Sequence, residues 1–282
     1  MKYFSIAFLL TACNIEYKVH SHGPPVPAGE CDIENPIPSP ESFKPIAVCS
    51  ASDSQVSPVW GAVDFIGEES YDPTDYKLID YAWEIVESPE GSVASLGYDT
   101  PNKGDFVPDL AGEYTVELVV MNERCVVSDP CQVTIEAVPS QDLWVEMIWE
   151  FPGDDMDLHL VKDNAPYESE GDCYYGNCVA DYDTPSLDWG DPSSYLDDPR
   201  LDLDDIENIG PENINIADPV AGKYRVVVHD YPGSVNETPN TVTVKIHMNG
   251  ELVYEEAKVI SGEDSYTPFA EIDWPSMTIQ EL

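Results

Sequence analysis

The chain has 282 residues, with 12 Lys and Arg against 55 Asp and Glu, which gives a formal net charge of −43 at pH 7. This charge repels phosphate backbones and anionic headgroups, so it excludes nucleic-acid binding and polybasic membrane binding and favours cationic partners or metal ions. Because 42% of the residues are hydrophobic and 10% aromatic, the chain can still form packed cores, and its length suggests about two domains.

Residues 1–12 are predicted to be a lipoprotein signal peptide. Lys2 precedes an apolar run, Tyr3 to Leu10, that is too short to span a bilayer. The next residues, Leu10-Thr11-Ala12-Cys13, resemble a bacterial lipobox, which makes Cys13 the expected lipidation site. The alternative is an ordinary signal peptide cleaved nearby, with Cys13 incidental. No later segment is apolar enough to cross a bilayer, so we expect membrane contact through the lipid anchor only.

Residues 13–45 are predicted to be a tether that carries the folded part away from the membrane. Seven prolines fall between residues 14 and 45, and proline-rich segments favour polyproline II at ~3.1 Å per residue. In some Gram-negative cells, Asp after the lipidated Cys retains a lipoprotein at the inner membrane. Since Asn14 stands at this position, we expect an envelope protein exposed at the outer membrane.

The other six cysteines predict disulfides, as an even number in an exported chain does. Cys173 and Cys178 bracket a short turn and most simply pair with each other. For the rest we favour Cys49 with Cys131 and Cys31 with Cys125, while Cys125 with Cys131 stays open. Zinc binding is not expected, because no Cys-x-x-Cys pair occurs.

Residues 46–139 are predicted to be a β-sandwich, because short alternating apolar runs are separated by Pro, Gly, Asp and Ser. The predicted strands are Val59 to Ile66, Leu78 to Val86, Tyr114 to Met121 and Val133 to Val138. Trp83 is expected to fill the core, with Tyr114, Val116, Leu118 and Val120 pointing inward.

Three segments of this region resemble a known family. They are Ser70-Tyr71-Asp72-Pro73, Ile79-Asp80-Tyr81-Ala82-Trp83 and Phe106-Val107-Pro108-Asp109-Leu110-Ala111-Gly112-Glu113-Tyr114. Together they resemble a PKD-type immunoglobulin-like domain. The resemblance implies a spacer or binding module and no catalytic residue.

Residues 140–282 are predicted to be a second, jelly-roll-like β-sandwich, which makes the chain all-β. This part holds 32 acidic and six basic residues over positions 141 to 282. Asn249-Gly250 between two strands predicts a type I′ hairpin turn. The predicted strands are Leu143 to Phe151, Met156 to Val161, Tyr224 to His229, Val242 to Met248, Leu252 to Ile260 and Phe269 to Trp274.

This region also carries motifs of a family. They are Asp157-Leu158-His159-Leu160, Cys173-Tyr174-Tyr175, Gly210-Pro211-Glu212-Asn213 and Gly222-Lys223-Tyr224-Arg225-Val226. In that order they resemble the β-sandwich domain of the YfaP-like bacterial family. The whole arrangement is similar to surface lipoproteins of predatory or social proteobacteria, and it brings no catalytic residue.

Acidic loops of the second region predict a Ca²⁺ site. Ca²⁺ takes six to eight oxygen ligands, which Asp-rich loops can supply. In Leu201-Asp202-Leu203-Asp204 the alternation places both carboxylates on one face, whereas an EF-hand is excluded by Ile206 and Glu207. A solvated acidic surface is the alternative. The candidate ligands are Asp154, Asp155, Asp157, Asp197, Asp198, Asp202, Asp204 and Asp205.

The histidines and the aromatic residues give weaker indications of a functional site than the acidic loops do. Asp157 and His159 share a strand face, which suggests a metal pair or a general base, or simply a polar strand face. The loop from residue 172 to 199 carries aromatic residues that predict either a carbohydrate platform or a local core beside the Cys173–Cys178 bridge. These residues are Tyr174, Tyr175, Tyr182, Trp189 and Tyr195.

Three functions are compatible with these features. The favoured one is a non-enzymatic, monomeric surface module for binding or adhesion, with a glycan or a surface protein as ligand and calcium in the acidic domain. The second is an acidic envelope spacer without a specific ligand. The third is a hydrolase that uses a carboxylate pair. None of the common motifs for nucleophilic, zinc-dependent or nucleotide-dependent enzymes occurs in the sequence.

Overall fold

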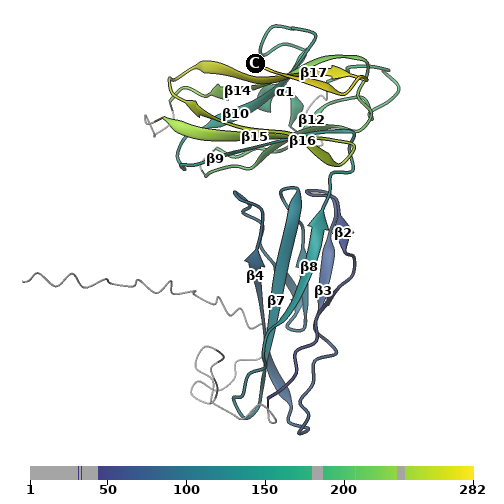
Figure 1. Cartoon of the computed structure of the whole chain (residues 1–282), viewed down its shortest axis with the longest axis vertical. Coiled ribbons are helices and arrows are strands. Elements are labelled where there is room, and N and C mark those ends of the chain that lie inside the picture. The colour runs from purple at the N-terminus through teal and green to yellow at the C-terminus, as the bar shows by residue number, and fades with distance from the viewer. Residues whose placement is uncertain (1–30, 32, 34–43, 180–186, 207, 234–238) are drawn as a thin grey trace, which may run out of the picture.

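The computed structural model describes residues 31, 33, 44–179, 187–206, 208–233 and 239–282. Two β-sandwiches follow one another along the chain, which confirms the all-β prediction (Figure 1). The predicted signal peptide, Cys13 and most of the tether lie outside the described residues. Within the described part, no helix is both long and apolar enough to cross a bilayer.

The first sandwich packs a sheet ordered β1-β3-β6-β5 against a sheet ordered β2-β8-β7-β4. Trp83 is 5% exposed in its core, and the four residues predicted to point inward from Tyr114 to Val120 are fully buried. The strands are β1 (Ser50–Ala51), β2 (Gln55–Val56), β3 (Val63–Ile66), β4 (Leu78–Glu87), β5 (Gly97–Thr100), β6 (Lys103–Phe106), β7 (Gly112–Asn122) and β8 (Cys131–Ala137).

The second sandwich packs a sheet ordered β11-β10-β14-β17-β18 against a sheet ordered β12-β13-β9-β15-β16. Its elements are β9 (Leu143–Trp149), β10 (Met156–Lys162), β11 (Asp172–Cys173), α1 (Tyr175–Cys178), β12 (Arg200–Leu203), β13 (Glu212–Ile216), β14 (Gly222–Asp230), β15 (Asn240–Met248), β16 (Glu251–Ile260), β17 (Ser265–Trp274) and β18 (Thr278–Glu281). The predicted hairpin joins β15 to β16, with positive φ at Asn249 and Gly250.

Alternation along the strands separates the core of the second sandwich from its outer faces. On β10, Leu158 and Leu160 belong to the core, whereas Asp157 and His159 point to the opposite face. That outer face is covered in part by the segment between β10 and α1, so Asp157 and His159 are 4% and 0% exposed. The sheet therefore carries a second buried layer made of polar and aromatic side chains.

Three disulfides join the cysteines in the pairing favoured from the sequence. Cys31 pairs with Cys125, Cys49 with Cys131, and Cys173 with Cys178. The first two belong to the first sandwich and its N-terminal approach, where they tie together segments 94 and 82 residues apart in the chain. The third closes the turn that contains α1.

The two sandwiches meet end to end, with the strands of the second running across those of the first (Figure 1). Glu146 on β9 is 1% exposed and accepts hydrogen bonds from the backbone N–H of Ala111, at 2.7 Å, and from Trp144 Nε1, at 2.8 Å. The Arg200 guanidinium lies over the Trp60 ring, 4.3 Å from its centroid. A buried hydrogen bond and a cation–π contact thus join the domains.

Candidate metal centre

Three carboxylates from distant parts of the chain converge at one edge of the second sandwich. Asp157 lies near the start of β10, Asp204 follows β12 directly, and Glu212 begins β13. One carboxylate oxygen from each lies within 4.8 Å of the other two. Asp157 and Glu212 are buried, and Asp204 is exposed, so the group opens to solvent on the Asp204 side.

The geometry of β10 explains why Glu212 turns toward it. On the side away from β14, β10 pairs only with the short β11, through Leu160 and Val161. The backbone N–H of Leu158 is therefore left without a strand partner on that side. Glu212 reaches across from the other sheet, and its Oε2 accepts this N–H at 2.7 Å. A buried Glu side chain thus bridges the two sheets at their open edge.

The neighbouring loop arranges further carboxylates around this group. Asp205 accepts hydrogen bonds from Asn208 and from the Gly210 backbone N–H, which shapes the connection between β12 and β13. Its own N–H approaches Glu212 Oε1 at 3.5 Å. Asp155, directly before β10, is half-buried and feels the negative charges of Asp157, Asp204 and Asp205.

The pKa values of the cluster rise because burial and mutual repulsion disfavour ionisation. For Asp155, burial first and then Asp157 raise the pKa to about 7. Burial and then Asp157 also raise the pKa of Glu212 well above its ordinary value, and the same two causes raise the pKa of Asp204. Without a cation, the carboxylates of the cluster are therefore either partly protonated or repel one another near neutral pH.

Asp157 contributes a buried carboxylate oxygen that accepts no hydrogen bond. Among the described residues, its Oδ2 has no hydrogen-bond partner. The ring nitrogen Nδ1 of His229 lies 3.7 Å away, too far for a hydrogen bond but close enough for an ion pair when the imidazole is protonated. Across the described residues, no recorded salt bridge joins a Lys or Arg to Asp157, Asp204 or Glu212. Since a buried carboxylate oxygen without a donor is costly, this donor set fits a hard cation.

The structure brings only part of the predicted ligand set together. Asp155, Asp157, Asp204 and Asp205 are neighbours, and Asp154 lies beside them, where it accepts a hydrogen bond from Asn240 Nδ2 at 3.1 Å. Glu212 was not among the predicted ligands. The structure places it in the fully buried strand Glu212–Ile216, where an acidic residue needs a donor or a cation, but the burial of this strand is not visible in the sequence.

Asp197 and Asp198 lie elsewhere and close the loop that carries Trp189. Asp197 Oδ2 accepts the backbone N–H of Asp191 at 2.6 Å, and Asp198 Oδ1 accepts that of Trp189 at 2.8 Å. Both side chains are engaged in local hydrogen bonds typical of turns. They are placed to shape the loop, away from the three converging carboxylates.

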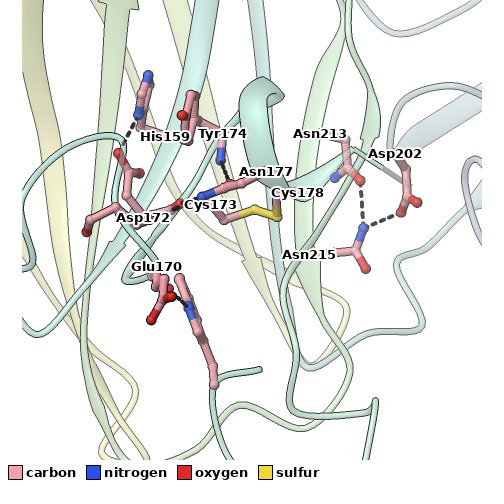
Figure 2. Close-up of a disulfide and its surroundings, with 12 residues drawn as sticks. His159, Glu170, Asp172, Cys173, Tyr174, Asn177, Cys178, Asp202, Asn213 and Asn215 are labelled. Atoms are coloured by element: carbon pink, nitrogen blue, oxygen red, sulfur yellow. Dashed lines mark hydrogen bonds and ion pairs between the residues drawn. A yellow bond between two sulfur atoms is a disulfide. The ribbon is translucent and has the colours of Figure 1, made fainter. Parts of the chain in front are cut away.

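Asp202 is separated from Asp204 by an irregularity in the strand pairing. The register with β13 shifts between Leu201 and Leu203, which interrupts the simple alternation expected from the sequence. Asp202 accepts a hydrogen bond from Asn215 Nδ2 at 2.5 Å and lies 3.4 Å from Arg200. Figure 2 shows Asp202 bonded to Asn215.

Asp157 and His159, which the sequence suggested as a metal pair, a general base or simply a polar strand face, do not pair with each other in the structure. His159 Nδ1 instead lies 2.8 Å from Asp172 Oδ2, and both side chains are fully buried (Figure 2). The His159 ring stacks on Tyr174, with centroids 5.2 Å apart, and its Nε2 has no hydrogen-bond partner. Although both residues share a face of β10, the turn that carries Asp172 supplies a closer carboxylate.

The other two histidines among the described residues also have acidic neighbours, which the sequence did not identify. His229 lies between Asp157 and Asp264, and although its burial lowers the pKa, these two carboxylates raise it above the ordinary value. His247 Nε2 lies 3.6 Å from Glu146, the residue that accepts the interdomain hydrogen bond. His229 therefore belongs to the surroundings of the metal centre, and His247 to the domain junction.

The aromatic residues of the loop differ in their burial. Trp189 is 6% exposed, packs on Tyr224, and donates from Nε1 to the Glu170 carbonyl. Tyr174 stacks on His159, whereas Tyr175 is 38% exposed and Tyr195 is 78% exposed. The candidate at position 182 lies outside the described residues.

Comparisons with known proteins include a likeness to a solved structure. No family model matches the chain, and no curated protein matches it. A solved structure described as "Solution structure of the PKD domain from KIAA 1837 protein" is similar at 24% identity and a TM-score of 0.27, covering 36% of this chain and 90% of that one. The function proposed below therefore depends on the geometry of the site itself.

Proposed function

We propose that the chain is a non-enzymatic, lipid-anchored module for binding or adhesion at the cell surface, whose acidic domain is completed by Ca²⁺. The first sandwich acts as a spacer, and Cys13 is the anchor at the outer membrane. The calcium ligands are Asp157, Asp204 and Glu212, with Asp155 and Asp205 beside them. In this proposal the cation organises the surface that recognises a partner.

The observation that carries the proposal is the buried Asp157 Oδ2, which accepts no hydrogen bond from the described residues, has His229 at ion-pair distance, and lies among carboxylates with raised pKa values. A solvated acidic surface would leave its carboxylates exposed to water. Here two of the three converging carboxylates are buried. Ca²⁺ suits the group because it accepts mono- and bidentate carboxylates in flexible geometry, whereas Mg²⁺ demands an octahedron and gives up its waters reluctantly.

The test is calorimetric titration of the chain from residue 14 onward, with its disulfides intact, against Ca²⁺ and Mg²⁺. We expect saturable Ca²⁺ binding, a rise in melting temperature, and loss of both in Asp157→Asn and Glu212→Gln. The matched controls are Asp53→Asn and Glu251→Gln, because both residues are exposed and lie outside the cluster. Weak, non-saturable binding that is equal in all variants would refute the site and leave the acidic spacer as the better account.

A further inference from the structure

Two tyrosines form a half-exposed aromatic rim beside the metal centre. Tyr175 on α1 is 38% exposed, and Tyr231, directly after β14, is 37% exposed. Their ring centroids are 5.7 Å apart, and the ring planes are nearly perpendicular, at 87°. The two rings therefore form a corner with aromatic surface open to solvent.

Both tyrosines are tied to the acidic cluster. The backbone N–H of Tyr231 donates to the Asp155 carbonyl at 2.9 Å. The Tyr175 hydroxyl interacts with that of Tyr231 and lies within electrostatic reach of Asp157, and burial together with these neighbours raises its pKa. A ligand that contacts these rings also approaches the carboxylates.

The segment that presents Tyr175 is fixed by several independent contacts. The Cys173–Cys178 disulfide closes the turn, and Asn177 Nδ2 donates to the Asp172 carbonyl at 2.8 Å (Figure 2). Tyr174 stacks on the buried His159, which is held by Asp172. Because the turn is already ordered before a ligand binds, the binding free energy does not include the entropic cost of ordering it.

The chemistry of the two parts defines one class of ligand. Ca²⁺ binds six to eight oxygens, and three carboxylates open to solvent at Asp204 leave coordination positions for ligand hydroxyls. The adjacent tyrosine faces suit an apolar C–H surface. A pyranose ring offers both adjacent hydroxyls and an apolar face. The chain's net charge of −43 disfavours acidic sugars, so a neutral sugar is the better fit.

We propose that Tyr175 and Tyr231, together with a calcium ion held by Asp157, Asp204 and Glu212, form a binding site for neutral pyranose sugars of surface glycans. The ligand's adjacent hydroxyls complete the calcium coordination, and its apolar face lies on the tyrosine corner. This inference rests on the proposed calcium site.

The experiment measures binding of the methyl glycosides of mannose, fucose, galactose and glucose to the chain from residue 14 onward, by NMR or calorimetry, with Ca²⁺ or with EGTA. Ca²⁺ binding is measured on each variant first. We expect at least one glycoside to bind with Ca²⁺ and to lose at least tenfold in affinity with EGTA or in Tyr175→Ala and Tyr231→Ala. Tyr175→Phe keeps the ring and retains binding. Tyr195→Ala, at a 78% exposed residue, is the matched control and changes nothing.

The outcomes separate this inference from the function on which it rests. If Ca²⁺ binds but no glycoside of the panel does, or if both alanine variants bind sugar like the wild type, the sugar site is refuted while the calcium site stands. Sugar binding that persists in EGTA also refutes it. If Ca²⁺ itself does not bind, both proposals fall. Near-ultraviolet circular dichroism of each variant verifies that the fold is retained.

Discussion

Replacing Glu212 by Gln should make the metal-free domain more stable and remove its response to Ca²⁺. Gln keeps an oxygen that can accept the Leu158 N–H, which Glu212 accepts at 2.7 Å, and it removes a buried negative charge. Two unit charges at the 4.8 Å limit of this cluster repel by about 3 kcal/mol at an effective dielectric of about 20. Protonation relieves part of this cost near neutral pH, because the pKa of Glu212 is raised by burial and by Asp157.

We therefore expect metal-free Glu212→Gln to gain about 1 to 3 kcal/mol at pH 7, or roughly 3 to 10 °C in melting temperature. In the wild type, Ca²⁺ at 100 times its Kd should add about 2.7 kcal/mol, and in the variant nothing. The assay is thermal and urea unfolding with EGTA and with Ca²⁺. The control Glu251→Gln should stay within about 0.5 kcal/mol under both conditions.

The result that would refute this reasoning is a variant that is less stable without metal and still responds to Ca²⁺ like the wild type. Glu212 would then act only as a hydrogen-bonding bridge between the sheets. The opposite signs of the two expected effects make the test specific, because a variant that is merely misfolded would be less stable under both conditions.

Three further predictions concern pH, the domain junction and the first sandwich. Burial first and then the charge of Asp157 raise the pKa of Asp155 to about 7 in the folded protein, against about 4 in the unfolded chain. The contribution of Asp155 to the free energy of unfolding is therefore fully present below pH 4 and is lost as the pH rises through 7. Metal-free Asp155→Asn should therefore gain stability over the wild type between pH 5 and pH 8 in urea unfolding. Glu146→Ala leaves the Ala111 N–H without its acceptor, so it should cost about 1 to 3 kcal/mol and increase interdomain motion in NMR relaxation. Asp72→Ala removes the acceptor of Asn122 Nδ2 and should lower the free energy of unfolding of the first sandwich by about 1 to 3 kcal/mol, measured by urea unfolding.

Each of these predictions has an outcome that contradicts it. An unchanged difference between Asp155→Asn and the wild type from pH 5 to pH 8 would mean that this carboxyl does not titrate near neutrality. Glu150→Ala, at an exposed residue that follows β9, is the control for Glu146, and equal effects of the two would argue against a buried junction bond. If Asp72→Ala were neutral, its hydrogen bonds in the turn would carry no net stabilisation.

The sequence predicted the long strands because they alternate between core and surface. Tyr114 to Val120 and Val242 to Met248 are examples, and both lie in central strands of the structure. The short strands β1, β2, β5, β11 and β18 contain only two to four residues. Alternation over so few residues is not distinguishable from a turn, so only their pairing in the folded domain defines them.

The type of residue in the candidate site could be predicted from the sequence, but which residues converge there could not. Clustered Asp residues indicated a cation, yet which of them converge depends on tertiary features that local patterns do not contain. A register shift between Leu201 and Leu203 separates Asp202 from Asp204. Glu212, from the other sheet, accepts a hydrogen bond from the backbone N–H of Leu158 on β10. His159 likewise contacts the carboxylate of Asp172, 13 residues later in the chain, and not that of Asp157 on the same strand.

The most direct test of the central claim is a crystal structure of the protein grown with CaCl₂, with anomalous diffraction used to locate calcium. We predict an anomalous peak at the edge of the second sandwich, with oxygens of Asp157, Asp204 and Glu212 at about 2.3 to 2.6 Å from the ion. At saturating Ca²⁺, a site that holds only water between these three carboxylates would contradict the account.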